Sequence, residues 1–122
     1  MITGVVRGSE ATVRFRVKDA SGQERDLAGI IDSGFTGSLT LPPWLIRSFG
    51  LRWRSRGTAI LANGAVDQFD IYEATVIWDG VPRRVLVEEA DTGPLVGMAL
   101  LRGYDLMIRV VPGGRVTITA VP

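Results

Sequence analysis

The sequence predicts an all-β domain, a closed or nearly closed β-barrel with one or two short helices, in which residues 1–122 form a single unit. Three observations predict it. Fifteen glycines are spread along the chain and separate short apolar runs, as in many all-β domains. Apolar and polar residues alternate strictly from Ala11 to Lys18, which is typical of a strand with one buried face. The length fits one domain of roughly 100–150 residues and is too short for two.

The first part of the chain predicts a β-hairpin. Val13, Phe15 and Val17 would share the buried face of its first strand. Asp19–Gly22 follows as a turn, because glycine supplies the positive φ that such turns need. The second strand ends in Leu27–Ile31, and this apolar end predicts burial on both faces.

A short helix is predicted after a proline pair. The chain is irregular between Asp32 and Gly37 and then passes the apolar positions Leu39 and Leu41. Pro42-Pro43 suits the first turn of a helix over Trp44–Phe49, which the following glycine would end.

Three further strands are predicted in the middle of the chain. They cover about Thr58–Leu61, Val66–Val76 and Val81–Glu88. Asp79-Gly80 predicts a tight turn between the last two, because both central positions of such a hairpin turn have positive φ.

The C-terminal part predicts a second short helix and a last pair of strands. The helix covers Met98–Arg102 and is ended by Gly103. Two alternating segments, Leu106–Val110 and Arg115–Val121, flank a turn at Pro112–Gly114.

Composition excludes several kinds of chemistry. The chain has no cysteine and no histidine, so a thiol nucleophile, a disulfide and the commonest metal ligands are excluded. Any proton chemistry therefore falls to carboxylates, Lys18 or tyrosines, and we expect no metal and no cofactor. No apolar run approaches the ~20 residues that a membrane span requires, so no membrane contact is expected. No signal peptide opens the chain, which makes the cytoplasm the expected location.

The positive charge of the chain is mostly arginine, and its densest group surrounds Trp53. Arg52, Arg54 and Arg56 would share one face of a strand, as an anion-binding stripe or as a solvated face. A nucleic-acid-binding barrel that uses these arginines is one alternative function. The net charge of +1 lacks the footprint of a dedicated nucleic-acid binder, so we expect no nucleic-acid partner.

One constellation has the character of a site. Asp32 directly follows an apolar strand and precedes Ser33 and Gly34, so its carboxylate would be rigidly held while glycine lets another backbone approach. An ordinary turn is the plain alternative. The same residues with Thr36 and Gly37 also match the phosphate loop of actin-like ATPases, but that fold needs two α/β domains, which this chain cannot supply.

Three ordered segments resemble the retropepsin-like aspartic proteases, among them small bacterial and archaeal single-domain members. The first is the apolar pair with Asp32-Ser33-Gly34, matching the family's Asp-Thr/Ser-Gly loop. The second is the glycine-bearing hairpin tip Leu61–Ala65, where the family has its flap. The third is Leu95-Val96-Gly97, which leads into Met98–Leu101 like the family's apolar segment before its C-terminal helix. The resemblance spans almost the whole chain.

The resemblance implies a role for each matched residue. Asp32 would be the catalytic carboxylate, Ser33 would reach across a dimer axis, and the Gly34 amide would hydrogen-bond the carboxylate. Gly97 would let its strand pack beneath the loop. Substrate-binding positions of the flap and cleft would be Phe35, Leu61, Ala62, Asn63 and Gly64, with Val66 as a further apolar candidate.

The resemblance also implies a homodimeric aspartic endopeptidase that cleaves a peptide or protein substrate. Each chain has one such loop, and two-fold symmetry would supply the second carboxylate. Two carboxylates within about 3 Å share one proton, so one can act as general base on a water while the other donates to the scissile carbonyl. The alternative is a non-catalytic dimeric barrel that binds peptides or proteins in the same groove.

Overall fold

The computed structural model describes all 122 residues as ten strands and two short helices. The strands are β1 (Ile2–Arg7), β2 (Glu10–Lys18), β3 (Glu24–Ile31), β4 (Leu39–Leu41), β5 (Arg52–Ile60), β6 (Val66–Trp78), β7 (Val81–Glu89), β8 (Leu95–Val96), β9 (Tyr104–Ile108) and β10 (Arg115–Ala120). The helices are α1 (Pro43–Phe49) and α2 (Met98–Leu101).

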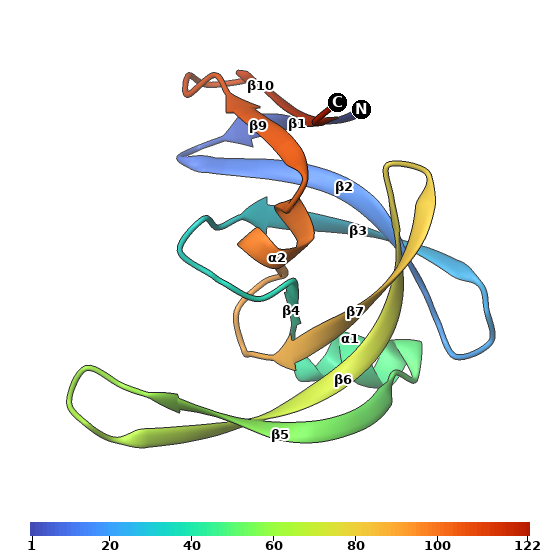
Figure 1. The fold of residues 1–122 in the computed structure, drawn as a ribbon, viewed down its shortest axis with the longest axis vertical. Coiled ribbons are helices and arrows are strands. Elements are labelled where there is room, and N and C mark those ends of the chain that lie inside the picture. The colour runs from blue at the N-terminus through green and yellow to red at the C-terminus, as the bar shows by residue number, and fades with distance from the viewer.

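All ten strands belong to one sheet, part of which closes on itself. The order β6-β7-β4-β8-β3-β2 becomes a ring of six strands because β2 also pairs with β6, with Arg16 opposite Ile77. β5 extends the sheet beyond β6 as a long projecting hairpin, and β1, β10 and β9 extend it beyond β2 (Figure 1). The predicted all-β, nearly closed barrel is confirmed.

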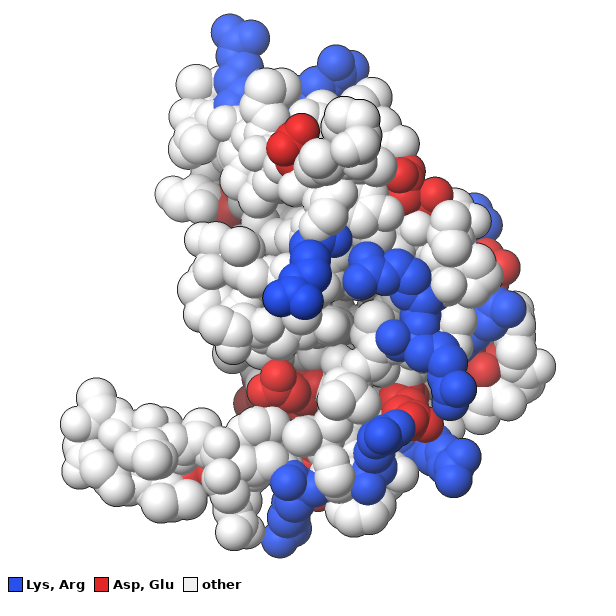
Figure 2. All heavy atoms as spheres, in the orientation of Figure 1, with Lys and Arg blue, Asp and Glu red and all other residues white.

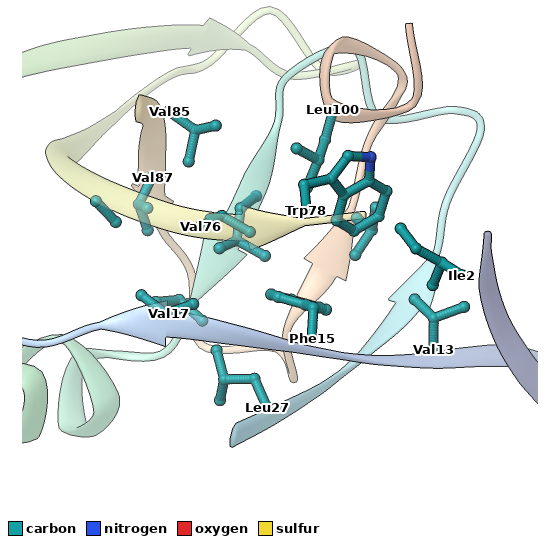
Figure 3. Packing of buried hydrophobic residues seen from close by; sticks show 14 of the residues in the cluster. Ile2, Val13, Phe15, Val17, Leu27, Val76, Trp78, Val85, Val87 and Leu100 are labelled. Atoms are coloured by element: carbon teal, nitrogen blue, oxygen red, sulfur yellow. The ribbon is translucent and has the colours of Figure 1, made fainter. Parts of the chain in front are cut away.

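The core fills this ring and continues onto β1, β10 and α1, and Trp78 is its largest completely buried side chain. The predicted alternation of β2 is confirmed, because Val13, Phe15 and Val17 all point into the core (Figure 3). Trp78 is completely buried and meets the ring of Phe15 edge to face at 5.9 Å and that of Tyr104 at 6.3 Å. Such aromatic pairs add to the stability that burial of apolar area provides.

Local turn and cap chemistry follows the sequence closely. The Asp19 carboxylate accepts hydrogen bonds from the amides of Ser21 and Gln23, at 2.9 and 3.0 Å, which closes the predicted turn. Helix α1 ends at Gly50, whose φ of 64° is the left-handed cap conformation that glycine favours. Asp79 and Gly80 both have positive φ, 53° and 78°, as the predicted tight turn requires.

The apolar end of β3 differs from the prediction. Ala28 is exposed, and Ile30 and Ile31 are only half-buried, so burial on both faces is wrong for the single chain. The reason is that the buried Leu27 and Gly29 alternate with the more exposed Ala28 and Ile30. One face of β3 therefore contacts the core, and no second layer covers the other face.

Strand β5 also differs from the prediction, because it begins at Arg52 and not near Thr58. Its register shifts at Arg54, where a β-bulge interrupts the alternation that would have aligned three arginines. Arg54 pairs with Glu73, and the Arg56 guanidinium lies 3.5 Å from Asp70. These cross-strand ion pairs neutralise Arg54 and Arg56, two of the three arginines for which the sequence left an anion-binding stripe or a solvated face open.

Candidate functional site

The loop from Asp32 to Ser38 connects β3 to β4, and a third strand holds both of its ends. β8 lies between the two, pairing in parallel with β3 (Ile31 opposite Val96) and antiparallel with β4 (Leu39 opposite Val96). The buried Thr40 hydroxyl also links β4 to β8, because it accepts a hydrogen bond from the Leu95 amide at 3.0 Å. The loop is therefore fixed by strands from distant parts of the sequence.

Asp32 is positioned through both its backbone and its carboxylate. Its amide donates to the carbonyl of Val96 at 2.9 Å, which aligns it with the end of β8. Its Oδ1 accepts a hydrogen bond from the Gly34 amide at 2.9 Å, the contact that the family resemblance implied. Ser33 and Gly34 are exposed at the tip of the loop. The geometry thus presents a partly exposed, oriented carboxylate whose Oδ2 remains available.

The start of α2 packs directly beneath this loop. The amides of Met98 and Ala99 donate to the carbonyls of Phe35 and Gly37, at 2.8 and 3.1 Å. A Cβ atom on Gly97 would overlap the Gly37 carbonyl oxygen and lie 2.5 Å from Phe35 Cδ2. Only glycine leaves room for this approach, so the predicted packing of Gly97 beneath the loop is confirmed.

The Phe35 ring is half-buried and lies against its own loop. A Cβ atom on Gly37 would lie 2.6 Å from Phe35 Cζ, so the ring covers Gly37 as well as Gly97. This contact gives Phe35 a scaffolding role in the loop. Its role in a substrate cleft stays a prediction.

The predicted flap is the tip of the β5–β6 hairpin. The Leu61 amide donates to the Ala65 carbonyl at 2.8 Å, the Asn63 side chain accepts from the Ala65 amide at 2.9 Å, and Gly64 has a φ of 82°. Ala62 and its neighbours are exposed, and the hairpin projects away from the body on the side where the Asp32 loop lies (Figure 1). The tip and the loop remain apart within one chain.

A recess of about 550 Å³ lies between this hairpin and the ends of β4 and β7. Four carboxylates line it, and Figure 2 shows acidic side chains gathered where the projecting hairpin meets the body. They belong to Asp67, Glu88, Glu89 and Asp91.

Glu88 lines the recess and also contacts the Asp32 loop. Its Oε2 lies against Gly37, where a Cβ atom would overlap it. Glu88 reaches this place because β4 and β7 pair in parallel with Thr40 opposite Glu88. Burial raises the pKa of the Glu88 carboxyl above its usual range, since desolvation disfavours the charged form.

Glu88→Gln is therefore expected to raise the melting temperature at neutral pH. A raised folded-state pKa means that ionisation of Glu88 destabilises the fold, and glutamine removes that charge at similar size. The gain should shrink as pH falls through the raised pKa and vanish below the ordinary value of 4.5. Thermal unfolding between about pH 3.5 and 8 measures it. The exposed Glu10→Gln is the control, and an unchanged or lower melting temperature for Glu88→Gln at neutral pH would contradict this account.

Of the predicted site residues, the structure gathers Asp32, Ser33, Gly34 and Phe35 in one loop and places the other four at the hairpin tip. It adds two residues that sequence reasoning missed. Thr40 and Glu88 lie beside the loop through pairing between distant strands, for which no local pattern gives a signal. No helix of the chain is both long and apolar enough to cross a bilayer.

Of three comparisons with known proteins, the one with solved structures bears on the fold. No family model matches the sequence, and no curated protein matches it. Among solved structures, the chain is similar to a retropepsin-like aspartic protease from Rickettsia conorii, with a TM-score of 0.52 and 12% sequence identity. The similarity covers 98% of this chain and 94% of the other. The chain therefore has the retropepsin-like fold.

Proposed function

We propose that this chain is an aspartic endopeptidase that acts as a homodimer, with Asp32 of each copy forming the catalytic pair. The observation that carries the proposal is the Asp32 carboxylate itself. Its Oδ1 is held by the Gly34 amide, its Oδ2 remains available, and it lies at the start of a loop fixed by three strands of a retropepsin-like fold.

The chemistry follows from bringing two such carboxylates together. Two acids within about 3 Å cannot both ionise cheaply, so they share one proton. The ionised one removes a proton from a water held between them, and the protonated one donates to the oxygen of the scissile carbonyl. Proton transfer to the leaving nitrogen then breaks the C–N bond of the tetrahedral intermediate. No covalent adduct with the protein forms.

A single chain is incomplete for this reaction because it holds one loop of this kind. A two-fold axis beside Ser33 and Gly34 supplies the second carboxylate, and the exposure of these two residues leaves them free to meet a partner copy. The Ser33 hydroxyl reaches across this axis and bonds the partner's loop.

The substrate is a peptide or protein segment in extended conformation. It lies between the Asp32 loop and the flap, whose Leu61, Ala62, Asn63 and Gly64 contact it as an added strand would. The carboxylates of the recess, Glu88 among them, favour basic side chains in the bound segment. The cytoplasm remains the location that the sequence predicts.

Digestion of a peptide library at mildly acidic pH, repeated at decreasing protein concentration, tests the proposal. Cleavage per chain should fall on dilution in step with the dimer fraction measured by analytical ultracentrifugation, because each active site needs two chains. Cleaved peptides should be enriched in lysine and arginine near the cut. Undiminished cleavage by the monomer would overturn the paired mechanism. A stable dimer that binds peptides without cleaving any would support the non-catalytic barrel instead.

A further inference from the structure

A second cavity, of about 650 Å³, is separate from the acidic recess. It is formed by β1, the middle of β2, Ala28 of β3, and the end of β6 with the turn that follows it. None of its lining residues belongs to the Asp32 loop, the hairpin tip or the acidic recess. Whatever binds here is therefore separate from the proposed substrate.

The cavity results from the way in which β2 is shared between two neighbours. β3 occupies one edge of β2 from Thr12 to Lys18, so β1 and β6 must use the other edge. β1 pairs with β2 up to Val13, and β6 pairs with it from Arg16 onward. Arg14 and Phe15 lie between these two pairings, and the cavity opens there. The gap is thus built into the sheet topology and needs no mobile segment.

The lining of the cavity is strongly cationic. Arg7, Arg14 and Arg16 contribute three guanidinium groups, whereas Asp79 is the single carboxylate. Arg16 is neutralised by Glu24 and Asp26, at 3.3 and 3.5 Å. Arg7 and Arg14 take part in none of the ion pairs of the chain.

The rest of the lining is apolar enough to hold the body of a ligand. Ile2, Phe15 and Ile77 line the cavity together with backbone at Gly4, which has no side chain to fill it. A volume of this size lies within the range of small-molecule sites, and such sites combine apolar walls with a few charged groups that fix orientation. Guanidinium groups bind carboxylates and phosphates through paired hydrogen bonds.

We propose that this cavity binds a small organic anion, whose carboxylate or phosphate group is held by Arg7 and Arg14 and whose apolar body lies against Ile2, Phe15 and Ile77. The ligand bridges β1, β2 and the β6–β7 turn, and so stabilises the barrel where β2 lacks a strand partner. The site does not depend on the proposed proteolysis, since it shares no residue with it.

Calorimetric titration with phenyl phosphate and, separately, with benzoate tests this site, at low and constant ionic strength. The two probes distinguish a phosphate from a carboxylate ligand, and saturable binding of either supports the proposal. Arg14→Gln and Arg7→Gln should each weaken binding at least ~10-fold, because each removes a charge-assisted hydrogen bond to the anion. Bound probe should also raise the melting temperature of the unaltered protein.

Arg109→Gln is the matched control, because Arg109 is exposed, unpaired and outside the cavity. Thermal unfolding without ligand shows whether each variant is folded, and the two independent cavity variants keep the test valid if one is not. If neither phenyl phosphate nor benzoate binds, the proposal is overturned. So does binding that Arg109→Gln weakens as much as Arg14→Gln does, since that would reflect nonspecific charge attraction.

Discussion

Asp32→Asn is expected to lower the rate of peptide cleavage by ~10³-fold or more. Asparagine has nearly the same shape and can still accept the hydrogen bond from the Gly34 amide. It cannot take a proton from water or share one with a second carboxylate, and loss of such acid–base catalysis typically costs about 10²–10⁴ in rate. In the proposed homodimer the substitution removes both carboxylates of the pair together. Initial rates on a fluorogenic peptide cut by the unaltered protein measure the effect.

Asp26→Asn is the matched control, since Asp26 is an exposed carboxylate on β3 whose contact is an ion pair with Arg16. It should cleave at the unaltered rate. Mixing unaltered and Asp32→Asn chains should give heterodimers with one carboxylate and no activity of their own. Equal cleavage by the Asp32→Asn and unaltered proteins would remove Asp32 from the chemistry.

Gly97→Ala is expected to destabilise the fold and to abolish cleavage together. The φ of Gly97, −103°, is open to any residue, so the effect is purely steric. The added methyl group would overlap the carbonyl oxygen of Gly37 and lie 2.8 Å from that of Phe35. These are backbone atoms in a loop held by hydrogen bonds to α2, so they cannot yield without moving Asp32. Overpacking of this kind costs about 1–3 kcal/mol.

Chemical denaturation measures the change in the free energy of unfolding. Gly93→Ala is the control, because a Cβ atom there meets nothing within 4 Å and the backbone is not in the left-handed region. It should leave stability and cleavage unchanged. If Gly97→Ala proved as stable and as active as Gly93→Ala, the close packing of α2 beneath the loop would not be what positions the site.

The elements that the sequence predicts well are those set by local chemistry. The alternation in β2, the turn at Asp19–Gly22 and the glycine that ends α1 each depend on residues close together in the chain. The end of β3 was mispredicted because an apolar run does not show whether a second layer covers it. Ile31 packs against the core of the chain, whereas Ile30 points to the other face of β3.

Part of the candidate site can likewise be predicted from nearby residues, and part of it cannot. The order of Asp32, Ser33 and Gly34 identifies the loop, and Gly97 is identified through the family resemblance. The recess could not be predicted, since it depends on β4 pairing with β7, which brings Glu88 beside Gly37. Periodicity predicts strands but not their order in a sheet, so contacts between distant strands need the structure.

The most direct test of the account is a crystal structure of the assembly, with the distance between the two Asp32 carboxyl groups as its readout. We expect a two-fold dimer in which their nearest oxygens lie about 3 Å apart, the separation at which two acids share a proton. A dimer that keeps the two Asp32 loops on opposite surfaces, or a monomer in the crystal and in solution, would contradict the proposed catalytic pair.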